Sequence, residues 1–451
     1  MPFEEDNQPK EQRPVVVPLF RLEPPPTPML KKLKSGESKC LSLGETTELL
    51  PFEHGKTSSA HLEKIVDTQY SLLSTLDWDF KTVKTGNAIN SIHPYPAKFI
   101  PEIPQKLIEL YSPQDSTVIL DPFCGSGTTL IEAINMGFDA VGVDVNPLAC
   151  LISRVKTTPL HRDFCNVASQ IIENARVCVA KKEIQVPPIP RLDHWFNPNV
   201  QKALAILRQE INSVEISPLK EALQVALSSI IVKVSNQESD TRYAAIENNH
   251  SVEEVFQAFN LATGRMYQKM TPFWNTLDKS LGKNFGKATV LNRDILSLKA
   301  EELPFKIGLV VTSPPYPNAY EYWLYHKYRM YWLDMEPKVV LEHEIGARPH
   351  YFKTKPQTEQ DFELQMAKVF NLLSHVMILD SKACFLVGRS IIHGRIIDNS
   401  ALLQRAAKSH GFVLEDSVDR SILSNHKSFN PKHGNITKEA IMVFSLTRKQ
   451  Q

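Results

Sequence analysis

The stretch "STVILDPFCGSGTTLIEAINMGFDAVGVD", residues 116–144, decides the fold. It begins with a short apolar run, passes through a Gly-rich turn, continues in a helical pattern that Gly137 closes, and ends in a second apolar run. A strand, a helix and a second strand at this spacing form a βαβ unit, in which the two strands are parallel. The sequence therefore predicts an α/β domain built around a parallel sheet.

The same alternation of strands and helices returns in the second half of the chain. The segments that carry it are strand-like 287–295 and 306–313, helical 360–378, strand-like 383–388, helical 400–411, and an apolar pair at 412–422 and 439–446. The last pair predicts a final antiparallel hairpin. We therefore predict a doubly wound, Rossmann-like α/β fold with this hairpin at its end.

Two parts of the chain depart from this rhythm. Residues 1–60 carry prolines and scattered charges without periodicity, which predicts a disordered or extended N-terminal arm. Residues 160–285 are mostly helical in pattern and predict a helical insertion between two strands. The α/β domain then consists of a first part, 61–159, and a second part, 286–451.

The Gly-rich turn has the features of a nucleoside site. Gly125 and Gly127 lie between a strand and a helix, where the backbone can approach a ligand closely. Asp144 ends the next strand, from which a carboxylate can bind both ribose hydroxyls. A dinucleotide site would have a third glycine where Leu130 stands, and Asp121 is poorly placed beside a pyrophosphate. The turn therefore suits a cationic nucleoside such as S-adenosylmethionine, and the alternative is a tight turn with glycines for packing.

A second motif, "VVTSPPYPNAYEYW" at residues 310–323, ends a predicted strand with two prolines and a cluster of aromatic side chains. Pro314 and Pro315 give up backbone donors while their carbonyl oxygens remain able to accept. The strand end therefore offers hydrogen-bond acceptors next to the flat ring of Tyr316. Ligands of α/β enzymes bind at such strand ends, although a Pro-rich loop with core aromatics is the alternative.

Because it contains both the Gly-rich turn and the Ser-Pro-Pro-Tyr motif, the chain resembles the S-adenosylmethionine-dependent amino-methyltransferases of DNA. "DPFCGSGT" looks like their cofactor motif, "GVDVNP" like their ribose motif, "NRDIL" like the motif touching adenine, "TSPPY" like their catalytic motif, and "HPYPAKFIPEIPQKLI" like the segment ahead of the cofactor loop. The resemblance covers roughly residues 85–160 and 288–447. About 150 residues separate Asp144 from Asp294, far more than a minimal fold needs, so the place of the target-recognition element stays open.

The resemblance implies roles for particular residues. It implies a cofactor site formed by Tyr95, Lys98, Phe99, Asp121, Pro122, Phe123, Gly125, Gly127, Thr128, Asp144, Val145, Asp294 and Ile295. It implies a catalytic motif formed by Ser313, Pro314, Pro315 and Tyr316. Of the two parts of the domain, 61–159 then carries the cofactor loop and 286–451 the catalytic motif.

Ser-Pro-Pro-Tyr is the version usual in enzymes that methylate the 4-amino group of cytosine, and adenine enzymes more often begin the motif with Asp or Asn. The Ser313 hydroxyl and the Pro314 carbonyl are expected to accept the two amine hydrogens, after the base leaves the duplex and stacks on Tyr316. The alternatives are an adenine-N6 DNA methyltransferase, an RNA guanine-amino methyltransferase, and a catalytically silent DNA-binding subunit. A ring-carbon cytosine methyltransferase needs a Pro-Cys nucleophile, which none of the six cysteines provides.

The composition and the spacing of the cysteines limit which metal sites, cellular compartments and partners we expect. The cysteines show no zinc-ligand spacing, so no metal site is predicted. The chain has no apolar run of bilayer length and no apolar signal core at its start, so we expect a cytoplasmic protein without a membrane partner. The expected partners are double-stranded DNA and, in a restriction-modification system, a cognate nuclease.

Three further segments allow two interpretations each. The run "YEYWLYHKYRMYW" could follow a flipped nucleotide through Tyr320, His326, Lys327 and Arg329, or present a core-facing helix. "RPHYFKTK", residues 348–355, is either a phosphate-contacting loop or a solvated surface segment. "SNQESDTRY", residues 235–243, either lines the substrate cleft or, as we favour, is a polar loop that ends a helix.

Overall fold

A computed structural model describes residues 71–80, 88–96, 99–112, 117–180, 184–240, 242–282, 285–318, 320–422 and 438–448. All of them belong to one compact unit, Gln69–Gln451. The predicted arm, residues 1–60, lies outside the described residues, as does the predicted site residue Lys98.

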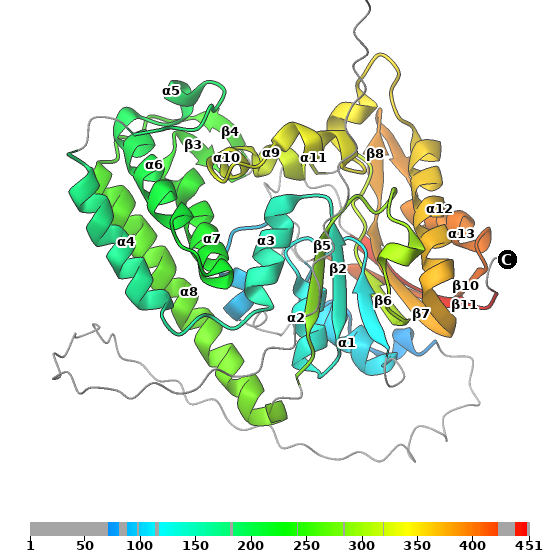
Figure 1. Ribbon diagram of the computed structural model, residues 1–451. Coiled ribbons are helices and arrows are strands. Elements are labelled where there is room, and N and C mark those ends of the chain that lie inside the picture. The colour runs from blue at the N-terminus through cyan, green and yellow to red at the C-terminus, as the bar shows by residue number, and fades with distance from the viewer. Residues whose placement is uncertain are drawn as a thin grey trace, which may run out of the picture. The chain divides into compact units, whose positions relative to one another are not determined.

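A seven-stranded sheet forms the centre of the molecule (Figure 1), with the strand order β10-β11-β7-β6-β1-β2-β5. Its strands are β1 (Val118–Asp121), β2 (Ala140–Asp144), β5 (Ala288–Asn292), β6 (Ile307–Thr312), β7 (Met377–Gly388), β10 (Phe412–Ser421) and β11 (Lys438–Leu446). β1 pairs in parallel with both β2 and β6, whereas β11 is antiparallel to both β7 and β10. The predicted doubly wound α/β fold with a terminal antiparallel hairpin is confirmed.

The central strands are buried on both sides because their alternate residues belong to two different cores. Leu120 and Val310 point into a core with α12 (Glu359–Val376) and α13 (Asn399–Lys408). Ile119 and Leu309 point the opposite way, into a core with α1 (Glu102–Leu110) and α2 (Thr128–Asn135). This pattern of continuous apolar strands is typical of a parallel sheet covered by helices on both faces (Figure 1).

The chain between β2 and β5 is mostly helical, and its helices form a layer beside the sheet with an apolar core of its own (Figure 1). These elements are α3 (Pro147–Lys156), α4 (Phe164–Cys178), α5 (Leu192–Trp195), α6 (Pro198–Asn212), α7 (Ser217–Val234), the strand pair β3 (Gln237–Ser239) and β4 (Arg242–Ala245), and α8 (Val252–Leu281). None of the helices in the described residues is long and apolar enough to cross a bilayer.

Short elements complete the carboxyl edge of the sheet, where the parallel strands end. After β6 come α9 (Tyr322–Tyr325), α10 (Lys327–Trp332) and α11 (Pro337–His343), and after β7 comes the hairpin of β8 (Ser390–Ile392) and β9 (Arg395–Ile397). Single 3₁₀ turns lie at Leu73–Thr75, Ala88–Ser91, Ala300–Glu302 and Arg348–Tyr351.

Candidate active site

A cavity opens at the carboxyl edge of the sheet, where the ends of β1, β2, β5 and β6 meet. Parallel strands place their last residues at one edge, so segments distant in sequence come together there. Residues from all five segments that carry the resemblance line it: Tyr95, Phe99, Asp121, Pro122, Phe123, Gly125, Thr128, Asp144, Val145, Asp294, Ile295, Ser313 and Pro315.

The Gly-rich turn is held in place by α3 from behind. Gly125 and Gly127 both have positive φ, and a Cβ on Gly127 would lie 2.8 Å from the Ser153 Oγ. The Ser153 hydroxyl donates to the Gly125 carbonyl at 2.8 Å, and the buried Lys156 ammonium donates to the Ser126 carbonyl at 2.7 Å. Gly127 therefore serves the packing of the turn against α3, which explains why it does not line the cavity.

Asp144, at the end of β2, fixes the same turn from the cavity side. Its carboxylate accepts the Gly125 N–H at 2.9 Å and the Asn146 N–H at 2.8 Å, one on each oxygen. Burial raises the pKa of Asp144 to about 6, although these two hydrogen bonds oppose the shift. Each oxygen keeps a lone pair for a further donor, such as a ribose hydroxyl.

Asp121, at the end of β1, is tied to the strand that carries the catalytic motif. The Thr312 hydroxyl donates to the Asp121 carboxylate at 2.6 Å, and the Phe123 N–H donates to the same oxygen at 3.1 Å. Burial raises the pKa of Asp121 to about 6, and the Thr312 hydrogen bond partly offsets this effect. Within the described residues, neither Asp121 nor Asp144 forms an ion pair with a lysine or arginine.

The catalytic motif begins one residue after Thr312. Ser313 lines the cavity, and its hydroxyl lies 3.4 Å from the Tyr316 hydroxyl, which also donates to Glu439 at 3.2 Å. Arg420 in turn donates to the other Glu439 oxygen at 2.5 Å. Tyr316 is only 6% exposed, and neither it nor Pro314 lines the cavity, so little of the Tyr316 ring is available for a base in this structure.

Another part of the cavity lining, here called the aromatic wall, contains Tyr95 and Tyr322 together with a third buried acid, Glu344. The Tyr95 ring stacks on Tyr322 at 6.0 Å and on His326 at 4.7 Å between ring centroids. Glu344 accepts the N–H groups of Tyr322 and Trp323 at 2.9 and 2.8 Å, which fixes the start of α9. Burial raises the pKa of Glu344 to about 8, and the nearby Asp144 adds to the shift.

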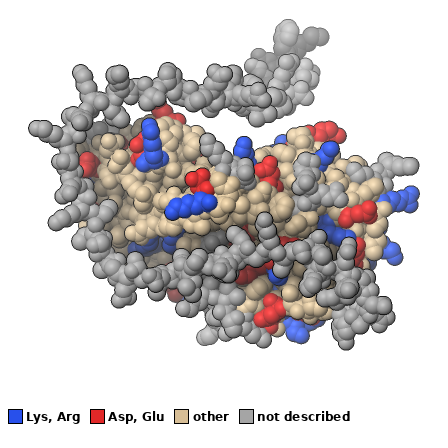
Figure 2. Space-filling model, turned by 90° about the horizontal axis from the view of Figure 1, so that it is seen from below, with Lys and Arg blue, Asp and Glu red and all other residues tan. Residues whose placement is uncertain are grey.

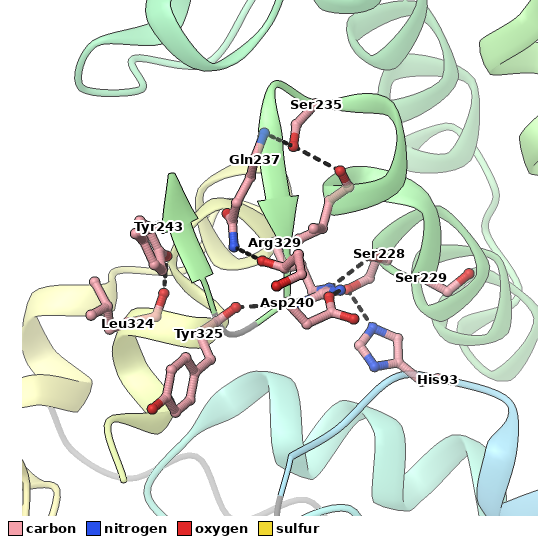
Figure 3. Close-up of polar contacts among 12 residues, drawn as sticks. His93, Ser228, Ser229, Ser235, Gln237, Asp240, Tyr243, Leu324, Tyr325 and Arg329 are labelled. Carbon is pink, nitrogen blue, oxygen red and sulfur yellow. Dashed lines mark hydrogen bonds and ion pairs between the residues drawn. The ribbon is translucent and has the colours of Figure 1, made fainter. Parts of the chain in front are cut away.

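The aromatic wall is anchored to the helical layer by a buried polar cluster (Figure 3), centred on Arg329 of α10. Arg329 is 1% exposed and donates to the Ser228 carbonyl at 3.1 Å, to the Tyr325 carbonyl at 3.3 Å, and to the Asp240 carboxylate. The His93 ring contacts the Ser228 hydroxyl at 2.9 Å. The cluster therefore joins α7 and the β3–β4 hairpin to α9, α10 and the segment that carries Tyr95.

The positions of these residues also bear on two of the segments for which the sequence allowed two interpretations. His326 and Arg329 are buried, so the hypothesis that these two residues follow a nucleotide is wrong. Tyr328 and Trp332 face the core, as the alternative predicted, whereas Tyr322 lines the cavity. "SNQESDTRY" forms the β3–β4 hairpin, and its Asp240 and Tyr243 bind α10 and the Leu324 carbonyl. None of its described residues lines the cavity.

Sequence reasoning missed several residues that line the cavity. They are Cys124, Ser126, Thr129, Asn146, Arg293, Tyr322, Val340, His343, Glu344 and Ile345. Five of them lie within three residues, along the sequence, of a predicted site residue, so the motifs indicated the segments to which they belong. Val340, His343, Glu344 and Ile345 follow α10 in a segment without a motif, and no sequence signal distinguishes Glu344 from an ordinary surface acid.

Comparison with known proteins gives a consistent result. Residues 35–154 match the model of a family described as DNA methylase. The Type II methyltransferase M.MvaI of Kocuria varians is 27% identical over 281 residues, which are 57% of this chain and 60% of that protein. M.BsoBI of Geobacillus stearothermophilus is 23% identical over 288 residues, 57% of this chain and 55% of that protein. M.MjaII of Methanocaldococcus jannaschii is 35% identical over 99 residues, 21% of this chain and 18% of that protein. The chain thus spans less than two thirds of each of these relatives.

Proposed function

We propose that this chain, which belongs to the DNA amino-methyltransferase family, transfers a methyl group from S-adenosylmethionine to the 4-amino group of cytosine in double-stranded DNA. The observation that carries the proposal is that Ser313 and Pro315 line the same cavity as Asp121 and Asp144. Acceptors for an amine therefore lie beside carboxylates that suit a cationic nucleoside.

The residues of the cavity fit S-adenosylmethionine. Asp121 is buried and Asp144 is partly buried, both have raised pKa values, and neither has a cationic side-chain partner among the described residues. Such carboxylates favour a ligand that brings positive charge. Asp144 would hold the ribose hydroxyls, Asp121 would face the cationic end, and Asp294 with Ile295 would border the adenine. When bound, S-adenosylmethionine supplies a methyl group on a sulfonium centre.

The side of the cavity formed by the catalytic motif would activate the amine. An exocyclic amine is a weak nucleophile because its lone pair is delocalised into the ring. The Ser313 hydroxyl, which lines the cavity, and the Pro314 carbonyl, which would have to become accessible from it, would accept both amine hydrogens and favour the tetrahedral nitrogen that attacks. The reaction needs no covalent intermediate with the enzyme.

The base would have to leave the duplex to reach Ser313, because its amine is paired inside the helix. In this structure Tyr316 fixes the Ser313 hydroxyl and is itself fixed by Glu439. The predicted stacking of the base on Tyr316 would require that its ring become more exposed. Comparing Tyr316→Ala with Tyr316→Phe separates the ring from the hydroxyl, since only the first variant loses the face for stacking.

The choice of cytosine rests on the Ser-first form of the motif, since adenine presents an amine of the same chemistry. The relatives M.MvaI and M.BsoBI are named Type II methyltransferases, which supports a place in a restriction-modification system with a cognate nuclease. The catalytic domain would consist of 61–159 and 286–451, with 160–285 as its insertion.

The experiment that tests this proposal uses the full chain, S-adenosylmethionine with an isotopically labelled methyl group, and unmethylated genomic DNA. The DNA is digested to nucleosides, which are identified by mass. Labelled 4-methylcytosine is the expected product. Labelled 6-methyladenine alone would contradict the cytosine assignment, and the absence of any labelled nucleoside from the DNA would contradict DNA as the substrate.

A further inference from the structure

The β8–β9 hairpin leaves the sheet beside the candidate active site (Figure 1). It follows the carboxyl end of β7, which is parallel to and paired with β6, and β6 ends one residue before Ser313. The Asn318 side chain, two residues beyond Tyr316, donates to the Ile391 carbonyl of the hairpin at 2.7 Å. The hairpin is therefore attached directly to the loop that carries the catalytic motif.

The hairpin presents apolar side chains to solvent. Ile391 and Ile396 face each other across the two strands, so they share one face, and Ile396 is 70% exposed. Phe352, from the segment after α11, is 57% exposed. The centroid of its ring lies 5.4 Å from that of the His393 ring, in an edge-on arrangement. Exposed apolar side chains grouped in this way indicate a surface that a partner covers.

Basic residues surround this apolar group. Residues 346–357 and 388–397 together contain Arg348, Lys353, Lys355, Arg389 and Arg395 and no Asp or Glu. The Arg348 guanidinium lies 5.4 Å from the centroid of the Phe352 ring. The coloured residues on the face seen from below, by contrast, show acidic and basic side chains intermixed (Figure 2). The charge near the hairpin thus complements a polyanion.

Two acidic side chains lie near these basic residues. Glu321 interacts electrostatically with Arg348, and Glu359 forms a weak pair with Arg395. The Arg395 guanidinium lies 3.5 Å from Glu359, and the Arg395 side chain is 68% exposed. An exposed pair of this kind contributes at most about 1 kcal/mol, so Arg395 can exchange it for another anion. No acidic partner of Lys353 or Lys355 lies within ion-pair distance among the described residues.

We propose that Arg348, Phe352, Lys353, Lys355 and Ile396, here called the hairpin face, bind duplex DNA and wedge it open beside the active site. Arg395 pairs with Ile392 across the two strands and so lies on the other face of the hairpin. The proposal rests on the proposed function and adds the surface that delivers the base. Lys353, Lys355 and Arg348 contact phosphates. Phe352 and Ile396 insert between the bases next to the target base and replace its stacking contacts when the target base leaves the duplex. Apolar side chains inserted at a base step partly unstack that step.

The electrostatic part is tested by DNA binding alone, without methyl transfer. A variant with Lys353→Ala and Lys355→Ala is compared with the wild type for its affinity for a short mixed-sequence duplex at several salt concentrations. Loss of two phosphate contacts reduces the slope of log affinity against log salt by about 1.8. The matched control carries Lys306→Ala and Lys408→Ala, two exposed lysines outside the hairpin face, and keeps the wild-type slope. An unchanged slope in the first variant, or equal changes in both, would overturn the proposal.

The wedge is tested by comparing native with heat-denatured genomic DNA as substrates. The Phe352→Ala variant should methylate native DNA at least several-fold more slowly than the wild type. On denatured DNA, where the bases are already unstacked, it should recover most of the wild-type rate. An equal loss on both substrates would contradict the wedge, and Phe352→Leu, which keeps an apolar side chain, should retain more activity on native DNA than Phe352→Ala.

The two tests separate this inference from the proposed function. If no DNA becomes methylated by the wild type, the proposed function fails, while the salt slope still reports whether the hairpin face binds DNA. If the wild type methylates DNA and the lysine variant keeps its slope, the hairpin face fails and the proposed function stands.

Discussion

The Thr312 hydroxyl donates to the Asp121 carboxylate at 2.6 Å, and this bond joins the last residue of β6 to the last residue of β1. It connects the strand of the catalytic motif to the strand of the cofactor turn, 191 residues apart in sequence. The two halves of the site are therefore held in a fixed relation by a buried, charge-assisted hydrogen bond.

Replacing Thr312 by valine keeps the shape of the side chain and removes this bond. We expect the free energy of unfolding to fall by about 1–3 kcal/mol, the usual cost of leaving a buried group without its partner. Urea denaturation measures it. Thr289→Val, at an exposed position of β5, is the matched control and should change stability by less than about 0.5 kcal/mol. Equal stability of the two variants would show that the bond does not hold the strands together.

Asp144→Ala should weaken binding of S-adenosylmethionine by about 1–3 kcal/mol, because it removes a charged acceptor that also fixes the Gly125 N–H. Titration calorimetry measures the affinity. Asp139→Ala is a useful control, since Asp139 precedes β2 at the opposite end of the same strand and lies outside the cavity. Affinity that is unchanged in Asp144→Ala would remove this residue from the cofactor site.

Binding of S-adenosylmethionine should become stronger as the pH rises through about 6. The pKa values of Asp121 and Asp144 are both raised to about 6 by burial, so both carboxyls are largely neutral below this pH. Ionised Asp121 attracts a cation and ionised Asp144 is the stronger acceptor for hydroxyl hydrogens, so the affinity falls by up to about tenfold per carboxyl for each pH unit below the pKa. Calorimetric titrations between about pH 5 and about pH 8 measure the trend. Constant affinity over that window would be evidence against an ionised pair facing the ligand.

Glu344 should make the protein less stable as the pH rises. Its pKa is raised from 4.5 to about 8 by burial, so the folded protein holds this proton more tightly than the unfolded chain does. The contribution of Glu344 to the free energy of unfolding therefore decreases between about pH 4.5 and about pH 8. Glu344→Gln removes this titration and should flatten the pH dependence, whereas Glu342→Gln, an exposed neighbour, should not. Urea denaturation across the window compares them, and identical profiles would contradict the assignment.

The Arg329 cluster should contribute more to stability than an exposed ion pair does. Arg329→Met leaves the Ser228 and Tyr325 carbonyls without their donor inside the protein. We expect a loss of about 1–3 kcal/mol, the usual cost of leaving a buried group without its partner, because Asp240 is 41% exposed and can be hydrated. Arg242→Met breaks an exposed pair with Glu238 and should cost no more than about 1 kcal/mol. Thermal unfolding of the two variants makes the comparison, and similar losses would mean that the cluster is not a structural anchor.

The sheet, the Gly-rich turn and the place of Ser313 at the cavity could be predicted because each depends on residues that are neighbours in sequence. Gly125, Asp144 and Ser313 belong to compact motifs, and parallel strands bring their ends to one edge. Glu344 and Arg329 could not be recognised, since their partners are set by tertiary packing: Arg329 meets Ser228 101 residues away. The burial of Tyr316 also depends on a distant residue, Glu439 on β11.

The central claim is that the ends of β1, β2 and β6 form one site for methyl transfer, and the Ser313→Ala variant tests it most directly. Transfer of labelled methyl to DNA is measured for the wild type and the variant, together with their affinities for S-adenosylmethionine. Removing an acceptor needed mainly in the transition state should lower turnover and leave cofactor affinity unchanged. Turnover equal to that of the wild type in a folded Ser313→Ala variant would contradict the claim.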